Sequence, residues 1–152
     1  MSVMHGRRRS AGFSLIEVLV AVLIVSVGVL GVAGLQLVSL RNNTASMFRT
    51  QAFQASYEII DRARANPEQD YSIAIDDPVP AFDDCTAQEC TPAQMRTFDV
   101  ATWLTQVQND LPAGDAEIVF DAGTSTLTVT VRWQDDRNPA AGTLDVTVTT
   151  SL

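Results

Sequence analysis

The chain has 152 residues, with 10 arginines, no lysine, 18 acidic residues and one histidine, and its net charge at neutral pH is −8. Such an acidic chain repels the phosphate backbone, which argues against direct binding of nucleic acid. A content of 46% hydrophobic and 18% charged residues excludes a disordered protein, and the length suits one domain with an appendage. The charges are uneven, because Arg7, Arg8 and Arg9 form a basic cluster and Glu17 is the only acid before residue 58.

Residues 18–40 form a run of 23 positions without a charged side chain. As a helix this run would be about 35 Å long, enough to cross a hydrocarbon core of about 30 Å. The arginine cluster precedes it, so the positive-inside rule predicts that residues 1–12 stay in the cytoplasm and residues 41–152 cross the membrane. A cleaved secretory signal peptide is the alternative, but its apolar region would span only about 7–15 residues. We therefore predict a transmembrane helix over residues 13–40.

Glu17 lies at the start of this apolar run. A carboxylate inside a membrane costs roughly 2.5–3.5 kcal/mol on insertion scales, so such residues are candidates for a function and need a partner. The nearest cations in the chain are the arginines of the N-terminal cluster. A second source of positive charge would be a new α-amino group, made by cutting the chain just upstream.

The segment GFSLIE at positions 12–17, between a basic leader and a long apolar run, resembles the processing site of type IV prepilins and related pseudopilins. In that superfamily a membrane peptidase removes the leader after the glycine, and the new N-terminal residue is methylated. The resemblance implies that prepilin peptidase cuts between Gly12 and Phe13, that residues 1–12 are discarded, and that Phe13 becomes the N-methylated N-terminus. Glu17 would then pair with the Phe13 amine of its own chain or of a neighbour, in an assembly charge pair. The alternative is an acid tolerated at the membrane surface.

Three glycines, Gly28, Gly31 and Gly34, recur in the apolar run at intervals of three residues. They lower helix propensity by about 1 kcal/mol each relative to alanine, which would suit a segment that stretches or bends during assembly. Ordinary use of small residues in a membrane helix is an equally good interpretation.

Residues 41–66 continue the helix in amphipathic form. Asn66-Pro67 should end this helix. Its apolar positions are spaced by three and four residues: Ala45, Phe48, Ala52, Ala55, Ile59 and Ala63. A second helix should begin at Thr91, with Pro92 in its first turn and Gln94 completing a capping box. Its apolar face would contain Met95, Phe98, Ala101, Leu104, Val107 and Leu111, with Trp103 at the border as a packing residue.

From Ala116 onward the period changes to two, which predicts three antiparallel strands with one apolar and one threonine-rich face. Ile118 and Phe120 should share the apolar face of the first strand. The apolar face would pack on the helix of residues 41–65. We therefore expect an α+β fold, in which a long N-terminal helix packs on a small antiparallel sheet, with residues 67–152 as a periplasmic pilin-like domain.

Residues 68–91 have the composition of a loop and contain both cysteines, Cys85 and Cys90. Export to an oxidising compartment favours a disulfide between them. A zinc site is disfavoured, because the only histidine, His5, lies in the leader. Three pairs of adjacent aspartates, at positions 76–77, 83–84 and 135–136, suit solvated loops. Calcium binding by one of them is the alternative, although no EF-hand spacing is present.

Further residues narrow the resemblance to the minor pilins known as the PilV group, the type IV pilus modification proteins. They are the segment CTPAQ at positions 90–94, Asp99, Trp103, the segment WQD at positions 133–135, and GVLGVAGLQ at positions 28–36. The resemblance implies a minor pilin that takes part in pilus assembly, in a priming complex or in the filament. A pseudopilin of a type II secretion system is the alternative. A third hypothesis is a single-pass membrane protein with a ligand-binding periplasmic domain.

Enzymatic activity is not expected, because without the leader the chain has neither histidine nor lysine for a Ser-His, Cys-His or Ser-Lys pair. We expect no cofactor and no metal. The implied partners are other minor pilins, the major pilin, prepilin peptidase, the inner-membrane assembly platform and the surrounding lipid. The implied location is the bacterial inner membrane, with the C-terminal domain in the periplasm, and then the pilus filament or its tip.

Overall fold

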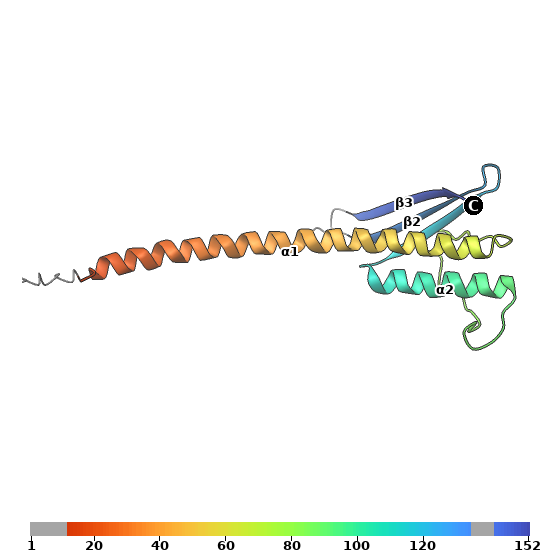
Figure 1. Cartoon of the computed structure of the whole chain (residues 1–152), viewed down its shortest axis with the longest axis horizontal. Coiled ribbons are helices and arrows are strands. Elements are labelled where there is room, and N and C mark those ends of the chain that lie inside the picture. Colours follow the sequence, from red (N-terminus) through yellow and green to blue (C-terminus); the bar gives the residue numbers. More distant parts are fainter. Residues whose placement is uncertain (1–11, 135–141) are drawn as a thin grey trace, which may run out of the picture. The chain divides into compact units, whose positions relative to one another are not determined.

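The structure is a computed structural model, and it describes residues 12–134 and 142–152 (Figure 1). Its elements follow the order α1 (Leu15–Ala65), α2 (Pro92–Asp110), β1 (Asp115–Asp121), β2 (Thr126–Gln134) and β3 (Thr143–Ser151). The predicted α+β class is confirmed, since a long N-terminal helix packs on one three-stranded antiparallel sheet. The chain divides between Leu40 and Arg41 into two compact units.

The predicted helix of about 50 residues is confirmed as α1, which has 51 residues. It ends at Ala65, and the Asn66 N–H donates to the Ala63 carbonyl at 3.1 Å. Pro67 lacks an N–H and cannot continue the helix. The predicted apolar face enters the core from Phe48 onward, whereas Ala45 stays half-buried outside it. The buried stripe also includes two residues that periodicity did not assign to it, Ser56 and Ile60.

The second helix begins as predicted. The Thr91 side chain accepts a hydrogen bond from the Gln94 N–H at 3.3 Å, and the Gln94 side chain accepts one from the Thr91 N–H at 3.0 Å. This capping box satisfies two backbone donors that a helix start leaves free. Trp103 lies fully inside the core, where its indole Nε1 donates to the Ala55 carbonyl of α1 at 2.8 Å. Trp103 therefore joins the two helices and is not a border residue.

Gly114 lies just beyond the end of α2 and packs closely against its last turn. A Cβ at this position would lie 2.3 Å from the Val107 carbonyl oxygen, a distance that real side chains do not reach. The same carbonyl accepts a hydrogen bond from the Leu111 N–H, which closes the last turn. Only glycine lets the chain pass this close to α2 before it enters β1.

The sheet has the order β1-β2-β3, with β2 antiparallel to both neighbours. Burial alternates along β2, and its core face consists of Leu127, Val129, Val131 and Trp133. On the other face, threonine hydroxyls pair across β2 and β3, at 3.1 Å for Thr128 with Thr149 and 3.1 Å for Thr130 with Thr147. The apolar and threonine-rich faces are therefore confirmed, and the core lies between the apolar face and the two helices.

Two features of β1 differ from expectation. Phe120 remains 37% exposed, because the last three residues of β1 lie beyond the fully covered part of the sheet. The segment predicted as a loop also pairs with β1, through Ile73, which exchanges both backbone hydrogen bonds with Ile118 at 3.0 Å. The outer edge of β1 is thus partly occupied by the chain itself.

A half-buried polar cluster ties the end of α1 to α2. The Tyr71 hydroxyl donates to the Asp99 carboxylate at 2.8 Å, and Arg62 approaches the same carboxylate at 3.3 Å. Arg62 also donates to Thr102 at 3.0 Å. Asn66 donates to the Pro92 carbonyl at 2.8 Å. Burial raises the pKa of Tyr71 to about 12, and the hydrogen bond to Asp99 acts in the same direction.

This pKa shift predicts an alkaline loss of stability. The folded chain keeps the Tyr71 proton up to about pH 12, whereas the unfolded chain releases it near the ordinary value of 10.0. The stabilisation is therefore complete below pH 10 and is lost as the pH rises toward 12. Urea unfolding of the full chain in detergent, followed by tryptophan fluorescence, should show this loss, and Tyr71→Phe should abolish it.

The matched control is Tyr57→Phe, since Tyr57 is 57% exposed on α1. This variant should keep the wild-type dependence of unfolding on pH. A Tyr71→Phe protein that loses stability between pH 10 and 12 as steeply as the wild type would contradict the prediction.

Candidate processing and assembly site

The residues before α1 are accessible. Gly12, Phe13 and Ser14 precede the first helical residue, Leu15, and the Phe13 side chain is 82% exposed. The Ser14 carbonyl accepts the first helical hydrogen bonds, from Glu17 at 3.0 Å and from Val18 at 3.2 Å. The peptide bond between Gly12 and Phe13 therefore lies just outside the helix, where a protease can bind an extended backbone. A Cβ on Gly12 would meet no atom within 4 Å, so packing within the described chain does not require glycine there.

Glu17 lies in the first turn of α1 and is exposed. It follows Ser14 by three positions, which is the S-x-x-E spacing of a capping box. Its negative charge also suits the positive end of the helix dipole. No ion pair joins Glu17 to another side chain within residues 12–134 and 142–152. The arginines of the leader, Arg7 to Arg9, which are the nearest cations in the sequence, lie outside the described residues.

No other described part of the chain covers the apolar half of α1. Every residue from Gly12 to Leu40 is exposed, and within the described residues this is the one helix long and apolar enough to cross a membrane. A continuous apolar surface of this size marks contact with lipid or with other proteins. The Ser26 hydroxyl donates to the Val22 carbonyl at 2.7 Å, so it brings no unsatisfied donor into that environment.

The three glycines of this segment do not interrupt α1. A Cβ at Gly28, Gly31 or Gly34 would meet no atom within 4 Å. Neither of the two interpretations of these glycines is favoured by the contacts of the single chain. Small residues become useful at this face once a second helix approaches.

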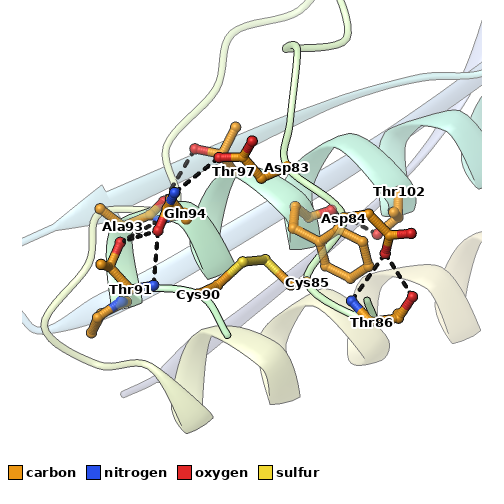
Figure 2. The surroundings of a disulfide bond; sticks show 12 residues. Asp83, Asp84, Cys85, Thr86, Cys90, Thr91, Ala93, Gln94, Thr97 and Thr102 are labelled. Atoms are coloured by element: carbon orange, nitrogen blue, oxygen red, sulfur yellow. Dashed lines mark hydrogen bonds between the residues drawn. A yellow bond between two sulfur atoms is a disulfide. The ribbon is translucent and has the colours of Figure 1, made fainter. Parts of the chain in front are cut away.

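The predicted disulfide is present between Cys85 and Cys90, whose Cα atoms lie 5.5 Å apart (Figure 2). Cys90 directly precedes Thr91, the N-cap residue of α2. Figure 2 shows that the capping residue Gln94 also reaches the loop, since its side-chain amide donates to Asp83 at 2.9 Å. The loop is therefore fastened to the start of α2 by a covalent bond on one side and a hydrogen bond on the other.

The paired aspartates have structural roles in their loops. Asp84 accepts hydrogen bonds from the Thr86 hydroxyl at 2.6 Å and from its N–H at 2.9 Å, and these bonds lower the pKa of Asp84. Asp77 accepts from the Ala74 N–H at 2.8 Å. Asp76 pairs with Arg132 at 3.2 Å. Within the described part of the chain, no group of three His, Cys, Asp or Glu side chains is placed to hold a metal ion. The third pair, at 135–136, lies outside the described residues.

Comparison with known families shows that residues 7–33 match the family model described as the prokaryotic N-terminal methylation motif. The chain carries the processing motif of the type IV pilin and pseudopilin superfamily. Members of this superfamily are structural subunits rather than enzymes, and the motif implies processing by prepilin peptidase. Together with the exposed apolar helix, it indicates membrane anchoring and a place in a pilus or pseudopilus. Searches of curated proteins and of solved structures give no match.

Sequence reasoning missed two features of this region. The S-x-x-E spacing of Ser14 and Glu17 was readable from the sequence, although no side-chain hydrogen bond completes a capping box there among the described residues. The hydrogen bond between Gln94 and Asp83 had no such signal, because the two residues are separated by a loop whose path only the fold determines.

Removal of the disulfide should destabilise the unit Arg41–Leu152. For a loop this short, the chain-entropy relation gives about 2 kcal/mol. We expect urea unfolding of a Cys85→Ser, Cys90→Ser double variant to show a free energy of unfolding lower by about this amount. The wild-type protein in reductant should match the variant. A variant as stable as the oxidised wild type would show that the bond adds no constraint.

Proposed function

We propose that this chain is a minor pilin of the PilV group, which enters a type IV pilus or the complex that primes it. The observation that carries the proposal is the methylation motif over residues 7–33, placed where an accessible backbone meets an apolar helix with no cover of its own. The acidic α+β part and the residues shared with the PilV group, such as Trp103 and Trp133, add support.

Processing creates the site that assembly uses. Cleavage between Gly12 and Phe13 removes residues 1–12 and leaves a methylated amine on Phe13, just before the first helical turn. This amine remains basic after methylation and carries a positive charge. In a filament core built from packed helices, both this charge and the Glu17 carboxylate leave water, so each needs an opposite charge.

The pair formed by the Phe13 amine and Glu17 would report correct axial register. Breaking one partner of a buried pair costs about 3–5 kcal/mol, because the remaining charge is uncompensated. The pair would report register where the partner amine comes from a neighbouring subunit, because a subunit inserted one helical turn away would then leave both charges unpaired. An amine of the same chain would neutralise Glu17 without reporting register.

The topology follows from the same proposal. The basic leader remains in the cytoplasm, residues 13–40 cross the inner membrane, and residues 41–152 lie in the periplasm as an amphipathic helix and a globular domain. The disulfide agrees with an oxidising compartment. The partners would be other minor pilins, the major pilin, the inner-membrane assembly platform and lipid. A type II secretion pseudopilin shares the motif and the helix, so co-purification with pilus or with secretion components separates the two.

Mature protein purified from membranes should begin with Phe13. Intact-mass and peptide mass spectrometry should find the loss of residues 1–12 and one added methyl group on the new N-terminus. A protein that retains Met1 in membranes that contain active prepilin peptidase would overturn the processing proposal.

Replacement of Glu17 should separate processing from assembly. Glu17→Gln keeps the shape but removes the charge, so we expect normal cleavage and a loss of at least tenfold in the amount recovered from sheared filaments. Glu17→Ala should behave in the same way. The matched control is Glu89→Gln, which changes an exposed acid in the disulfide loop and should leave recovery unchanged. Wild-type recovery of Glu17→Gln would refute the charge-pair mechanism.

A further inference from the structure

The strand β3 forms one edge of the sheet. It pairs with β2 over its whole length and, among the described residues, has no strand on its other side. It is nine residues long and regular, without proline or a basic residue, and Asp145 is its only charge. Natural proteins normally protect such an edge with charges, proline, a bulge or a covering segment, because its free backbone groups can pair with another chain.

The hydrogen-bond register shows which backbone groups of β3 are free. The Leu152 N–H donates to the Ser125 carbonyl at 3.0 Å, and these residues lie opposite each other one step beyond the ladder. Hydrogen-bonded pairs alternate along an antiparallel ladder. The N–H and carbonyl groups of Leu144, Val146, Val148 and Thr150 therefore point to β2, whereas those of the alternate residues point away from the sheet: Thr143, Asp145, Thr147, Thr149 and Ser151. The Ser151 carbonyl accepts from the Thr150 hydroxyl at 3.3 Å, so the edge open to a new strand runs from Thr143 to Thr149.

The opposite edge supports this register and shows a contrast. Ile118 of β1 directs its backbone groups away from β2, where they bind Ile73 at 3.0 Å. The Ser72 hydroxyl accepts from the Phe120 N–H at 3.2 Å on the same side. The chain thus occupies part of the β1 edge with its own backbone. Along β3 the described residues provide no backbone partner on the outer side, and the contact there is a side-chain one, from Arg64 of α1 to the Thr150 hydroxyl at 2.8 Å.

Apolar side chains of the core are also partly exposed along β3. Val146 is buried at 6% exposure, but its neighbours on the same face, Leu144 and Val148, are only half-buried. A further strand beside β3 would place alternate side chains next to these three residues. Apolar side chains at those positions would complete the cover of the core, and short polar ones would extend the threonine face.

We propose that β3 accepts an extended strand of a second exported protein, which adds to the sheet through main-chain hydrogen bonds. The strand would have alternating apolar residues, with serine or threonine between them, and no excess of acids. Charge favours a different protein over a second copy, because residues 41–152 hold 7 arginines against 17 acids, a net charge of −10. The inference concerns this edge and goes beyond incorporation of the chain into a pilus.

A peptide probe tests the edge directly. The probe is a labelled synthetic peptide with the sequence of β2, TLTVTVRWQ, flanked by two lysines at each end. Fluorescence anisotropy would measure its binding to the full chain in detergent. A scrambled peptide of the same composition, with its apolar residues contiguous, has the same charge and should not bind. Equal binding of the two peptides, or no binding of either, would overturn the proposal.

Variants at Thr147 test whether the peptide binds through main-chain hydrogen bonds of β3. Thr147→Pro removes an outward N–H that the β2 ladder does not use, so it should leave the urea unfolding curve close to wild type and weaken peptide binding about tenfold. Thr147→Ala keeps that N–H and should bind like the wild type. If Thr147→Pro lowers stability, Thr149→Pro replaces it, because the Thr149 N–H also points away from the sheet. Wild-type binding by a folded outward proline variant would refute main-chain pairing.

Photocrosslinking in membranes distinguishes the occupants. A benzophenone amino acid in place of Thr147 should cross-link to a segment of another protein in which apolar residues alternate. Loss of that cross-link when Thr149→Pro is added would support pairing at the edge. A cross-link to a second copy of the chain alone, or to lipid alone, would overturn the proposed partner.

Discussion

Between residues 18 and 40 the chain has no charged side chain and buries none of its own apolar surface. This constraint governs the remainder of the molecule. An apolar helix with every side exposed is stable only in lipid or among other helices, so the chain must be anchored or assembled. The single acid near its start, Glu17, then becomes informative, because a charge in that environment needs a reason. The methylation motif over residues 7–33 points to one, since the proposed processing would create an amine close by.

In the unit Arg41–Leu152, the same helix packs one side on a core. From Phe48 onward, one side of α1 is covered by α2 and the sheet, and Trp103 fixes α2 to α1 by burial and by its hydrogen bond to the Ala55 carbonyl. The Tyr71 and Asp99 pair fastens the end of α1 to the second helix. The polar groups in this joint are hydrogen-bonded to one another, as groups removed from water must be.

Much of this architecture was predictable from periodicity. Spacings of three and four residues located both helices, and the change to period two located the strands to within one or two residues. The buried stripe of α1 was wider than predicted because Ile60 and Ser56 lie beside the predicted face and are covered too. The Ile73 bridge could not be predicted, since one isolated residue pair has no period. The hydrogen bonds from Tyr71 to Asp99 and from Gln94 to Asp83 could not be predicted either, because they join segments that only the fold brings together. For the candidate site, the sequence itself contains the motif, whereas the accessibility of Phe13 and the start of α1 came from the structure.

The position of Cys90 next to the N-cap of α2 has a consequence for the order of events during biogenesis. Under the proposed topology, residues 41–152 would lack the covalent closure of the loop that precedes α2 while they are still on the reducing side of the membrane, and the helix start would be held by hydrogen bonds alone. Oxidation on the far side adds the remaining constraint. Under the proposed topology, full stability of the domain would thus be acquired only after translocation, and the same loop would keep the chain more pliable while it is still being exported.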